Sequence, residues 1–303
     1  MPTLFTTRIF KKKTSSKARE DTQNKGYKSN KPSSVYADGK EVVHPLQYLV
    51  GSGQSVGMQR EHNEDALYTF TSVLSDGKAE ELFGLFIIAD GMGGHRNGEV
   101  ASGVSIRVVA RYVVNQLYNI LLDPLHGSLS VGIQEILAGA INEAQKAVLQ
   151  YAPGGGTTIT IALLLGEQVT VSHVGDSRAY FILPERTLKR ITKDHSLVQH
   201  MVDLNQITES EAAVHPQKNV LLKAVGQPDP YLPDTQTLQI LPGAQLLLCS
   251  DGLWGVVPEK EILEITSSEK DPISACQKLV KAANKGGGPD NISVILVRIA
   301  GRK

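Results

Sequence analysis

Five aspartates in this sequence lie beside apolar runs that read as β-strands, and together they could do chemistry. They are Asp65, Asp90, Asp176, Asp251 and Asp290. All but Asp65 lie in a turn that contains glycine or asparagine, and Asp90 and Asp251 each follow an almost wholly apolar run. Gathering carboxylates near a core is unfavourable because of desolvation and mutual repulsion. Protonation, basic partners or divalent cations would be needed to relieve that cost.

Divalent cations are the most economical of these three solutions, since no equal set of lysines or arginines accompanies the five turns. Oxygen ligands alone favour a hard ion such as Mg²⁺, Mn²⁺ or Ca²⁺ over a structural Zn²⁺. Two such ions, about 3.5–4 Å apart, suit the hydrolysis of a phosphate ester, because they activate a shared water and neutralise phosphoryl charge. Arg60, five residues before Asp65, is well placed to bind the phosphate oxygens in a bidentate manner.

Two other kinds of site are disfavoured by the same residues. His195 and His200 are five apart and form no His-Glu-x-x-His motif, and no pair of cysteines lies near His173. The histidines are therefore predicted to be structural or surface residues and not zinc ligands. The glycine runs at 154–156 and 286–288 do not continue into the Gly-Lys-Ser/Thr of a phosphate-binding P-loop.

Composition limits the class of protein. The chain has 303 residues, of which 41% are hydrophobic and 20% charged, with a formal net charge of zero. This is enough for one large domain or two small ones. Residues 1–45 hold ten Lys or Arg against four Asp or Glu, and we expect a basic, disordered leader there. A tether to an acidic membrane or to nucleic acid through Lys11-Lys12-Lys13 is the alternative.

The remainder of the chain holds 21 basic against 27 acidic residues, which does not indicate a nucleic-acid-binding surface. No apolar run approaches the roughly 18 residues of a membrane span, and the N-terminus lacks the apolar segment of a secretory signal. Cys249 and Cys276 lie in apolar context, which predicts buried thiols in a reducing compartment. A cytoplasmic protein is expected.

Hydrophobic periodicity predicts alternating groups of strands and helices. Strands are expected at 50–57, 66–73, 82–89, 157–165, 169–174, 179–183, 187–191, 245–249 and 292–299, and helices at 97–121, 130–150, 259–267 and 272–284. Residues 193–226 are more polar and read as a surface insertion. Strands in runs followed by helices in runs indicate an α+β fold with antiparallel sheets and helices outside.

Eight short motifs occur in order across residues 48–300. They are Arg60-x-x-Asn63-Glu64-Asp65, Ala89-Asp90-Gly91-Met92-Gly93-Gly94, Gly156-Thr157-Thr158, Val174-Gly175-Asp176-Ser177-Arg178-Ala179, Asp194-His195-Ser196-Leu197-Val198, His215-Pro216, Ser250-Asp251-Gly252-Leu253 and Gly288-Pro289-Asp290-Asn291-Ile292-Ser293. In these residues the chain resembles the metal-dependent serine/threonine protein phosphatases of type 2C, in their bacterial form. Eight motifs in the family's order are highly specific, whereas one alone would be weak.

The resemblance implies a role for each acidic residue at two metal positions. Asp90 would bridge both metals, and the carbonyl group of Gly91 would ligate one of them. Asp251 and Asp290 would hold the first metal, and Asp65 would hold the second. Mg²⁺ or Mn²⁺ is the implied cofactor, with two ions in each site.

Further residues receive roles from the same resemblance. Glu64 would lie in or just behind the shell of the second metal, and Asp176, with Asp251, would bind a weaker third metal. Arg60 would bind the substrate phosphate. Met92 stands where animal members place a proposed general-acid histidine, and that role is not transferred to His95, which is expected to belong to the turn that begins a helix.

The fold implied is a four-layer α-β-β-α sandwich, with two antiparallel sheets and antiparallel helix pairs outside. Residues 46–303 would form the phosphatase domain, and the insertion at 193–226 would form a flap beside the cleft. The implied activity is hydrolysis of phosphoserine and phosphothreonine esters in proteins, opposing protein kinases in signalling. A monomer is expected.

Two alternatives are considered: the first belongs to a different functional class, and the second has the same chemistry. The first is a catalytically inactive binding module that keeps the fold, whose hallmark would be lost acids, and none of the five is missing. The second is an anti-sigma-type regulatory phosphatase with a dedicated partner, which would usually add a sensor domain. Residues 1–45 are too few to form one.

Overall fold

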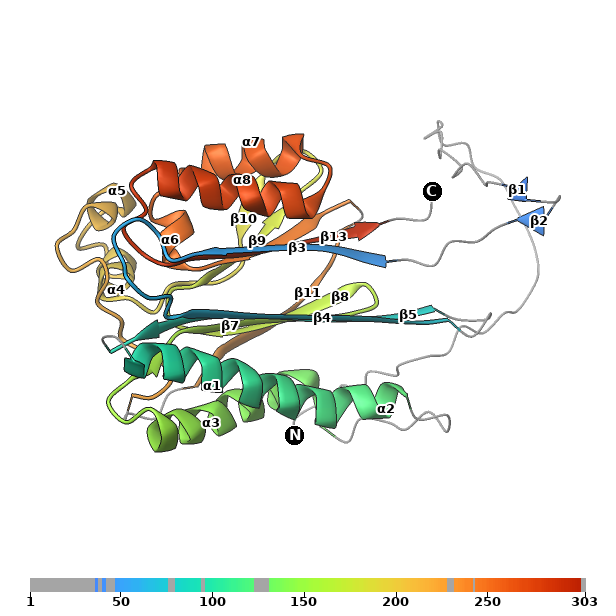
Figure 1. Ribbon diagram of the computed structural model, residues 1–303, viewed down its shortest axis with the longest axis horizontal. Helices are drawn as coiled ribbons and strands as arrows, with labels where there is room; N and C mark the ends of the chain where they lie inside the picture. The colour runs from blue at the N-terminus through green and yellow to red at the C-terminus, as the bar shows by residue number, and fades with distance from the viewer. Residues whose placement is uncertain are drawn as a thin grey trace.

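The computed structural model describes residues 36–37, 40–41, 47–75, 80–93, 96–122, 131–227, 232–241 and 243–300. Two antiparallel sheets pack face to face, and helices cover the outer face of each (Figure 1). The expected α-β-β-α sandwich is therefore confirmed. The predictions for residues 1–35 and for Gly94 and His95 concern residues outside these ranges. β1 (Tyr36–Ala37) and β2 (Lys40–Glu41) form only a short pair.

The six-stranded sheet has the order β11-β8-β7-β5-β4, with β6 paired to β5. Its strands are β4 (Asp65–Ser75), β5 (Glu80–Met92), β6 (Gly156–Thr157), β7 (Ile159–Leu165), β8 (Gln168–Val174) and β11 (Asp234–Gln239). β7 and most of β8 are buried, because layers cover both faces of this sheet and their continuous apolar runs satisfy both.

Two long helical segments cover the outer face of the six-stranded sheet. They are α1 (Arg96–Val113) and α3 (Ile133–Tyr151), which pack on the sheet through a shared apolar cluster. The helix predicted at 97–121 is not uniform, since α1 continues into a π-helical segment, η1 (Val114–Tyr118), and a last short turn, α2 (Asn119–Leu121). The ring of Tyr118 packs edge-on against Phe70 at the end of this run.

The five-stranded sheet has the order β10-β9-β12-β13-β3. Its strands are β3 (Gln47–Ser55), β9 (Arg178–Ile182), β10 (Leu188–Arg190), β12 (Gln245–Cys249) and β13 (Ile292–Ala300), and its outer face carries α7 (Glu259–Ser268) and α8 (Pro272–Lys285). Cys249 and Cys276 are buried free thiols, as predicted. Phe86 of β5 and Leu248 and Ile295 of the opposite sheet are fully buried in the core between the two sheets.

Three local predictions need correction. β5 does not end before Asp90 but runs on to Met92, because Gly91 and Met92 pair with β6. Asp251 is the first residue of a short helix, α6 (Asp251–Trp254). β11 was missed, since its sequence Asp-Thr-Gln-Thr-Leu-Gln is polar and only its pairing with β8 makes it a strand.

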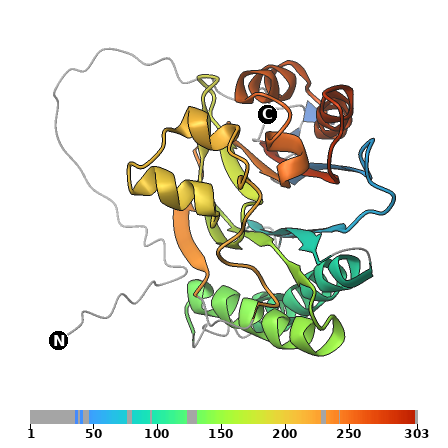
Figure 2. The same cartoon turned by 90° about the vertical axis from the view of Figure 1, so that its left-hand side faces the viewer.

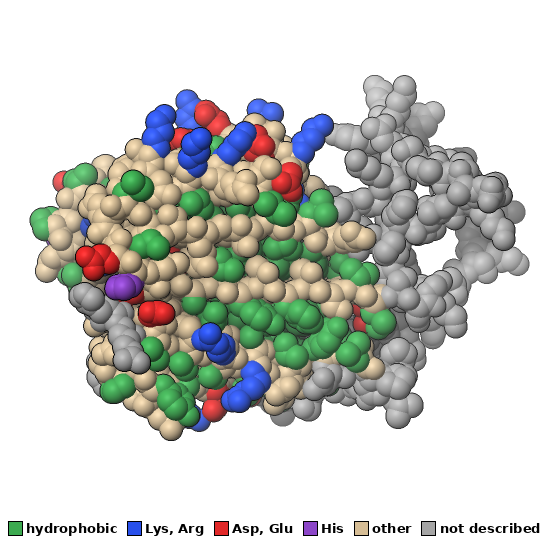
Figure 3. Space-filling model, in the orientation of Figure 1, with side chains coloured by type: hydrophobic (Ala, Val, Ile, Leu, Met, Phe, Trp, Pro, Cys, Tyr) green, Lys and Arg blue, Asp and Glu red, His purple; other side chains and the backbone are tan. Residues whose placement is uncertain are grey.

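The segment between β10 and β11 carries two short helices, α4 (Leu197–Asp203) and α5 (Glu209–Ala213). They lie beside α6 at one end of the sandwich, and Figure 2 shows that end facing the viewer. Figure 3 shows hydrophobic side chains along the side of the sandwich that faces the viewer. Leu49 of β3 and Val73 of β4 are exposed hydrophobic residues. No helix in the described part of the chain is both long and apolar enough to cross a membrane.

Candidate active site

Asp65 and Asp90 are brought together by the pairing of β4 with β5. The two residues are direct cross-strand partners, so their side chains share one face of the sheet. Thr158 fixes the backbone of Asp90 on the other side, because its hydroxyl accepts from the Asp90 N–H at 2.9 Å and its own N–H donates to the Asp90 carbonyl at 2.8 Å. The hydroxyl of Thr157 donates to the same carbonyl at 2.9 Å. Thr158 thus holds the main chain of Asp90 in place.

Asp251 comes from the opposite sheet. Ser250, between β12 and α6, is fully buried, and its hydroxyl donates to Asp65 Oδ2 at 2.8 Å. The N–H of Ser293 on β13 donates to the same hydroxyl oxygen at 2.9 Å. The carboxyl groups of Asp251 and Asp90 are close enough to share a hydrogen bond. One serine therefore joins the two sheets directly beneath the carboxylates.

Asp290 and Arg60 form the outer wall of the acidic cluster. Arg60 Nη2 lies 2.7 Å from Asp290 Oδ2, and the side chain of Arg60 is 52% exposed. Asn291 fixes the loop that carries Arg60, since its amide donates to the carbonyl groups of Val56 at 2.9 Å and His62 at 2.8 Å. In the sequence, Asn291 is recognisable only as a member of a motif. Its role as a link between distant segments depends on the fold.

Gly91 is required by close packing beside the acids. A Cβ atom there would lie 2.3 Å from the carbonyl oxygen of Gly98 and 2.6 Å from that of Glu64. The Gly91 N–H donates to the Glu64 carbonyl at 3.1 Å. A Cβ at Gly98 would lie 2.0 Å from Glu64 Oε2, so the Glu64 carboxylate lies against the first turns of α1. Glu64 and Gly91 are therefore neighbours of the acidic cluster.

Asp176 is buried in the turn between β8 and β9. Gly175 has a φ of 107°, and the turn brings the Asp176 carbonyl within 3.1 Å of the Trp254 indole N–H. The guanidinium group of Arg178 stacks over the Trp254 ring at 3.5 Å and binds the Asp194 carboxylate at 2.6 Å. The Asp176 turn is thus held against α6 on one side. On the other side it is held against Asp194, at the start of the segment formed by residues 193–226, which is called the flap segment below.

The electrostatics of the cluster are those of carboxylates that need a counter-charge. Withdrawal from water raises the pKa of Asp65 to about 7 and that of Asp251 to about 6. It raises the pKa of Asp90 and of Asp176 well above the ordinary range, and the negative charges of neighbouring carboxylates add to the increase. Asp65 Oδ1 and Asp251 Oδ1 are buried without a hydrogen-bond partner in the described structure. Unpaired, convergent oxygens of this kind fit a hard divalent cation.

A second group of titratable side chains lies away from the acidic cluster. His173, His195 and Asp234 have potential ligand atoms within 4.8 Å of one another. His195 Nδ1 accepts the N–H of Gly175 at 3.1 Å, so the ring proton is on Nε2, which faces the Asp234 carboxylate at 3.2 Å. The rings of His173 and His195 stack at 4.4 Å and 20°, so their lone pairs do not converge on a single point. The group acts as a structural link from the Asp176 turn to β11.

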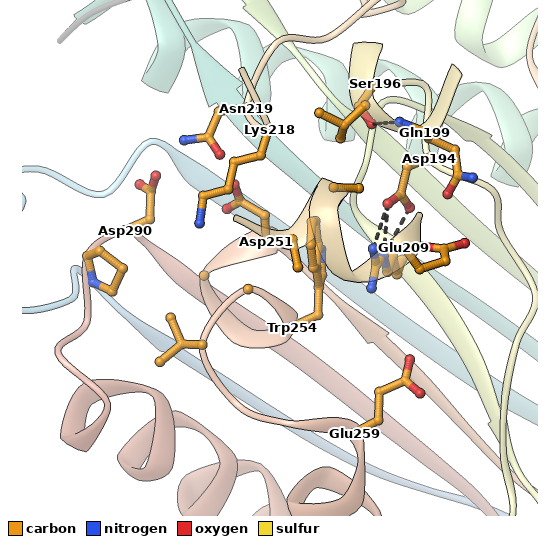
Figure 4. Close-up of a pocket in the computed structure, with 18 of the residues that line it drawn as sticks. Asp194, Ser196, Gln199, Glu209, Lys218, Asn219, Asp251, Trp254, Glu259 and Asp290 are labelled. Atoms are coloured by element: carbon orange, nitrogen blue, oxygen red, sulfur yellow. Dashed lines mark hydrogen bonds and ion pairs between the residues drawn. The ribbon is translucent and has the colours of Figure 1, made fainter. Parts of the chain in front are cut away.

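Two aspartates of the acidic cluster, Asp251 and Asp290, line a cleft of about 730 Å³. In Figure 4, Lys218 lies on the same side of Trp254 as Asp251 and Asp290, and Glu209 lies on the other side, by Asp194. Trp254 lies between Asp251 and the Asp194 region in the same view. The cleft therefore gives a substrate group access to the acidic cluster at Asp251 and Asp290.

All of the site residues predicted from sequence lie at this end of the sandwich. Three further residues join them without having been predicted: Ser250, Asn291 and Lys218. Ser250 and Asn291 are direct sequence neighbours of Asp251 and Asp290, and this adjacency is the signal by which they could have been predicted. Lys218 had no such signal, because only the fold of the flap segment brings it over the cleft.

Comparison with known proteins gives a consistent result. A family model described as "Protein phosphatase 2C" matches residues 52–284. The serine/threonine phosphatase stp of Listeria welshimeri is 35% identical over 247 residues, which cover 80% of this chain and 92% of the relative. Protein phosphatase PhpP of Streptococcus pneumoniae is 35% identical over 245 residues, covering 80% of this chain and 94% of that protein.

Solved structures show the same likeness. The serine/threonine phosphatase of S. agalactiae has a TM-score of 0.71 at 31% identity, covering 84% of this chain and 100% of the other. The catalytic domain of PstP, solved in complex with two manganese ions, has a TM-score of 0.68 at 28% identity, with 84% and 100% covered. With the acidic cluster, the order of its motifs and the sandwich in agreement, the chain belongs to the protein phosphatase 2C family.

Proposed function

We propose that this chain hydrolyses phosphoserine and phosphothreonine esters in proteins with the help of two divalent cations. The observation that carries the proposal is the acidic cluster, in which four aspartates have raised pKa values and two buried carboxylate oxygens have no partner among the described residues. The family membership and the two manganese ions of the PstP structure support the same reading. Mg²⁺ or Mn²⁺ is the proposed cofactor.

Each acidic residue receives a role in this proposal. Asp90 is the cross-strand partner of Asp65 and lies close to Asp251 of the opposite sheet. It would bridge the cations, and the carbonyl group of Gly91 would ligate one of them. Asp251 and Asp290 would hold the first cation, and Asp65 would hold the second. When bound, the two ions supply an activated water as nucleophile and neutralise the charge of the phosphoryl group.

Other residues orient these ligands. Ser250 donates to one oxygen of Asp65 and so leaves the other free for a cation. Glu64 would lie in or just behind the shell of the second cation, and Asp176, with Asp251, would hold a weaker third one. The hydrogen bonds of Ser250 to the Asp65 carboxylate and of Thr158 to the Asp90 main chain hold these two ligands in position. Hydrogen-bond partners of ligands tune metal sites in this way.

Arg60 is the proposed phosphate-binding residue. Its guanidinium group projects into the cleft, where Asp290 holds one of its nitrogens at 2.7 Å. The remaining N–H groups can donate to phosphoryl oxygens in a planar, bidentate manner. Asn291, by fixing the loop at Val56 and His62, keeps Arg60 in place before any substrate arrives.

The test is metal-titrated turnover of three matched peptides that carry phosphoserine, phosphothreonine or phosphotyrosine. We expect hydrolysis of the first two in Mn²⁺ or Mg²⁺, with little hydrolysis of the third, and complete loss in EDTA that excess metal reverses. Activity that survives EDTA would contradict the metal-dependent mechanism. A preference for phosphotyrosine would contradict the proposed substrate class.

We also propose a domain organisation and a biological setting for this activity. Residues 46–303 would be the catalytic unit, with 193–226 as a flap beside the cleft, since α4, α5 and Lys218 lie over the acidic end of the sandwich. The substrates would be targets of serine/threonine kinases, and the protein would act as a cytoplasmic monomer. The inactive-module alternative has no observation in its favour, because the acidic set is complete.

A further inference from the structure

The cations that line the cleft are not equivalent. Arg60 is paired with Asp290 at 2.7 Å. Arg178 and Arg190 both lie near Asp194, at 2.6 Å and 3.7 Å. Lys218 lines the same cleft, yet its ammonium group has no ion pair or hydrogen bond within the described part of the chain. It is therefore the cleft's one uncommitted positive charge among those residues.

The backbone around Lys218 is fixed, although its side chain is exposed. The Lys218 N–H donates to the carbonyl of His215 at 3.1 Å, which closes a turn after α5. Two residues later, the carbonyl of Val220 accepts the N–H of Leu197 at 2.8 Å, so the segment is joined to the start of α4. Main-chain hydrogen bonds thus fix the backbone from which the Lys218 side chain projects.

The side chain of Lys218 extends over the acidic cluster. In Figure 4 its nitrogen is directed toward the space between Asp251 and Asp290. Arg60 lines the same cleft from the loop before β4, where it is paired with Asp290.

A phosphate monoester carries close to two negative charges and several strong acceptor oxygens. One arginine cannot satisfy all of them, and an ammonium group supplies a compact charge with three donors. We propose that Lys218 is a second substrate-binding residue, which donates to a phosphoryl oxygen from the flap segment while Arg60 binds from the loop before β4. This inference rests on the proposed phosphatase function, and it assigns to the flap a direct part in recognising the phosphate.

The experiment compares Lys218→Gln and Lys218→Arg with the unchanged enzyme in saturating Mn²⁺. The substrates are p-nitrophenyl phosphate and a phosphothreonine peptide with no acidic residues. Because a charge-assisted hydrogen bond to phosphate is lost, we expect Lys218→Gln to lower kcat/KM by about tenfold or more on both substrates. The inhibition constant of inorganic phosphate should rise by a similar factor, and Lys218→Arg should retain most of the activity.

Lys223→Gln is the matched control. Lys223 belongs to the same segment, but its ammonium group lies 3.5 Å from Asp234 and outside the cleft, so the variant should stay within about twofold of the unchanged enzyme. Since Lys218 is exposed, equal melting temperatures should show that all three variants fold.

Two outcomes would overturn the inference. Unchanged kinetics and phosphate inhibition in Lys218→Gln would show that Lys218 is an ordinary surface lysine. A loss confined to peptides with acidic flanking residues would show that it binds the peptide and not the phosphate. If the unchanged enzyme hydrolysed no phosphoester, the proposed function itself would fail. Calorimetric binding of inorganic phosphate to the Mn²⁺-loaded protein and to Lys218→Gln would still decide the role of Lys218.

Discussion

Asp65 and Asp251 each present one buried oxygen that has no hydrogen-bond partner among the described residues. An unpaired buried acceptor costs about 1–3 kcal/mol, and more when it carries charge. The neighbouring hydrogen bonds do not remove this cost; Ser250, for example, occupies the opposite oxygen of Asp65. In the absence of cations, these unpaired oxygens therefore lower the free energy of unfolding of the protein.

Asp90→Asn is expected to abolish most of the turnover while leaving the fold intact. The amide cannot carry the negative charge that a bridging ligand needs, although its backbone hydrogen bonds to Thr158 are unchanged. We expect kcat to fall by about 100-fold or more, with weaker Mn²⁺ binding by calorimetry. Full activity of this variant would show that Asp90 does not bridge the cations.

The pH dependence of stability in the metal-free protein is a second prediction at this scale. Folding raises the pKa of Asp65 from 3.8 to about 7 and that of Asp251 from 3.8 to about 6. Between those values the folded state binds more protons than the unfolded state, so stability falls as pH rises from about 4 to 7. Each group contributes up to about 1.4 kcal/mol per pH unit within its own window.

Urea unfolding in EDTA at pH 5 and pH 7.5 would measure this effect. Asp65→Asn removes one of the titrating groups, so the variant should lose less stability over that interval than the unchanged protein. An equal loss in both proteins would contradict the assignment of a raised pKa to Asp65. Addition of Mn²⁺ at pH 7.5 should restore stability, because a ligand that binds only the folded state stabilises it.

At the scale of elements, the close packing of α8 on β3 depends on a glycine in that strand, which has no Cβ atom. α8 packs directly on β3, where a Cβ at Gly51 would lie 2.1 Å from the carbonyl oxygen of Pro272. The same strand leads into the loop that carries Arg60, and β13, its partner, begins immediately after Asp290 and Asn291. The close contact of α8 with β3 thus supports the outer wall of the site from below.

Gly51→Ala is expected to lower the free energy of unfolding by at least about 2 kcal/mol, because the added methyl group overlaps backbone that cannot move without displacing α8. Gly132→Ala is the matched control, since a Cβ there meets nothing within 4 Å. That variant replaces glycine at the N-cap of α3 and should cost less than about 1 kcal/mol. Equal effects of the two substitutions in urea unfolding would contradict the packing argument.

At the scale of the whole molecule, the site belongs to neither sheet alone. Asp65 and Asp90 come from the six-stranded sheet, whereas Asp251 and Asp290 adjoin strands of the five-stranded sheet. The buried interface between the sheets, including Phe86 and Leu248, therefore sets the distance between the two pairs of carboxylates. Catalysis is expected to require the complete sandwich.

Removal of residues 1–45 is expected to leave peptide turnover within about twofold of the full chain. Every residue proposed to bind metal or phosphate lies at Arg60 or beyond, and β3 begins at Gln47. Turnover of the phosphothreonine peptide by the shortened and full-length proteins would test this. A loss of cellular localisation with retained turnover would support a tether, and unchanged localisation would exclude it.

The sequence alone was sufficient for the local features and for the family. Apolar periodicity located α3, α7 and α8 to within a few residues, because a helix that packs on a sheet needs one apolar stripe. The acids Asp90 and Asp251 could be recognised from their neighbours, since each follows a continuous apolar run. Their motifs, and the cofactor class that carboxylates prefer, needed no coordinates.

Only the tertiary structure determined the contacts between distant segments. β11 is polar and becomes a strand only through its pairing with β8, while the histidines that stack beside it are 22 residues apart in the chain. Asn291 holds a loop more than 200 residues away, and Lys218 reaches the cleft only because the flap segment folds back over α6. Such contacts depend on how sheets and loops pack, and packing between remote segments leaves no periodic signal in the sequence.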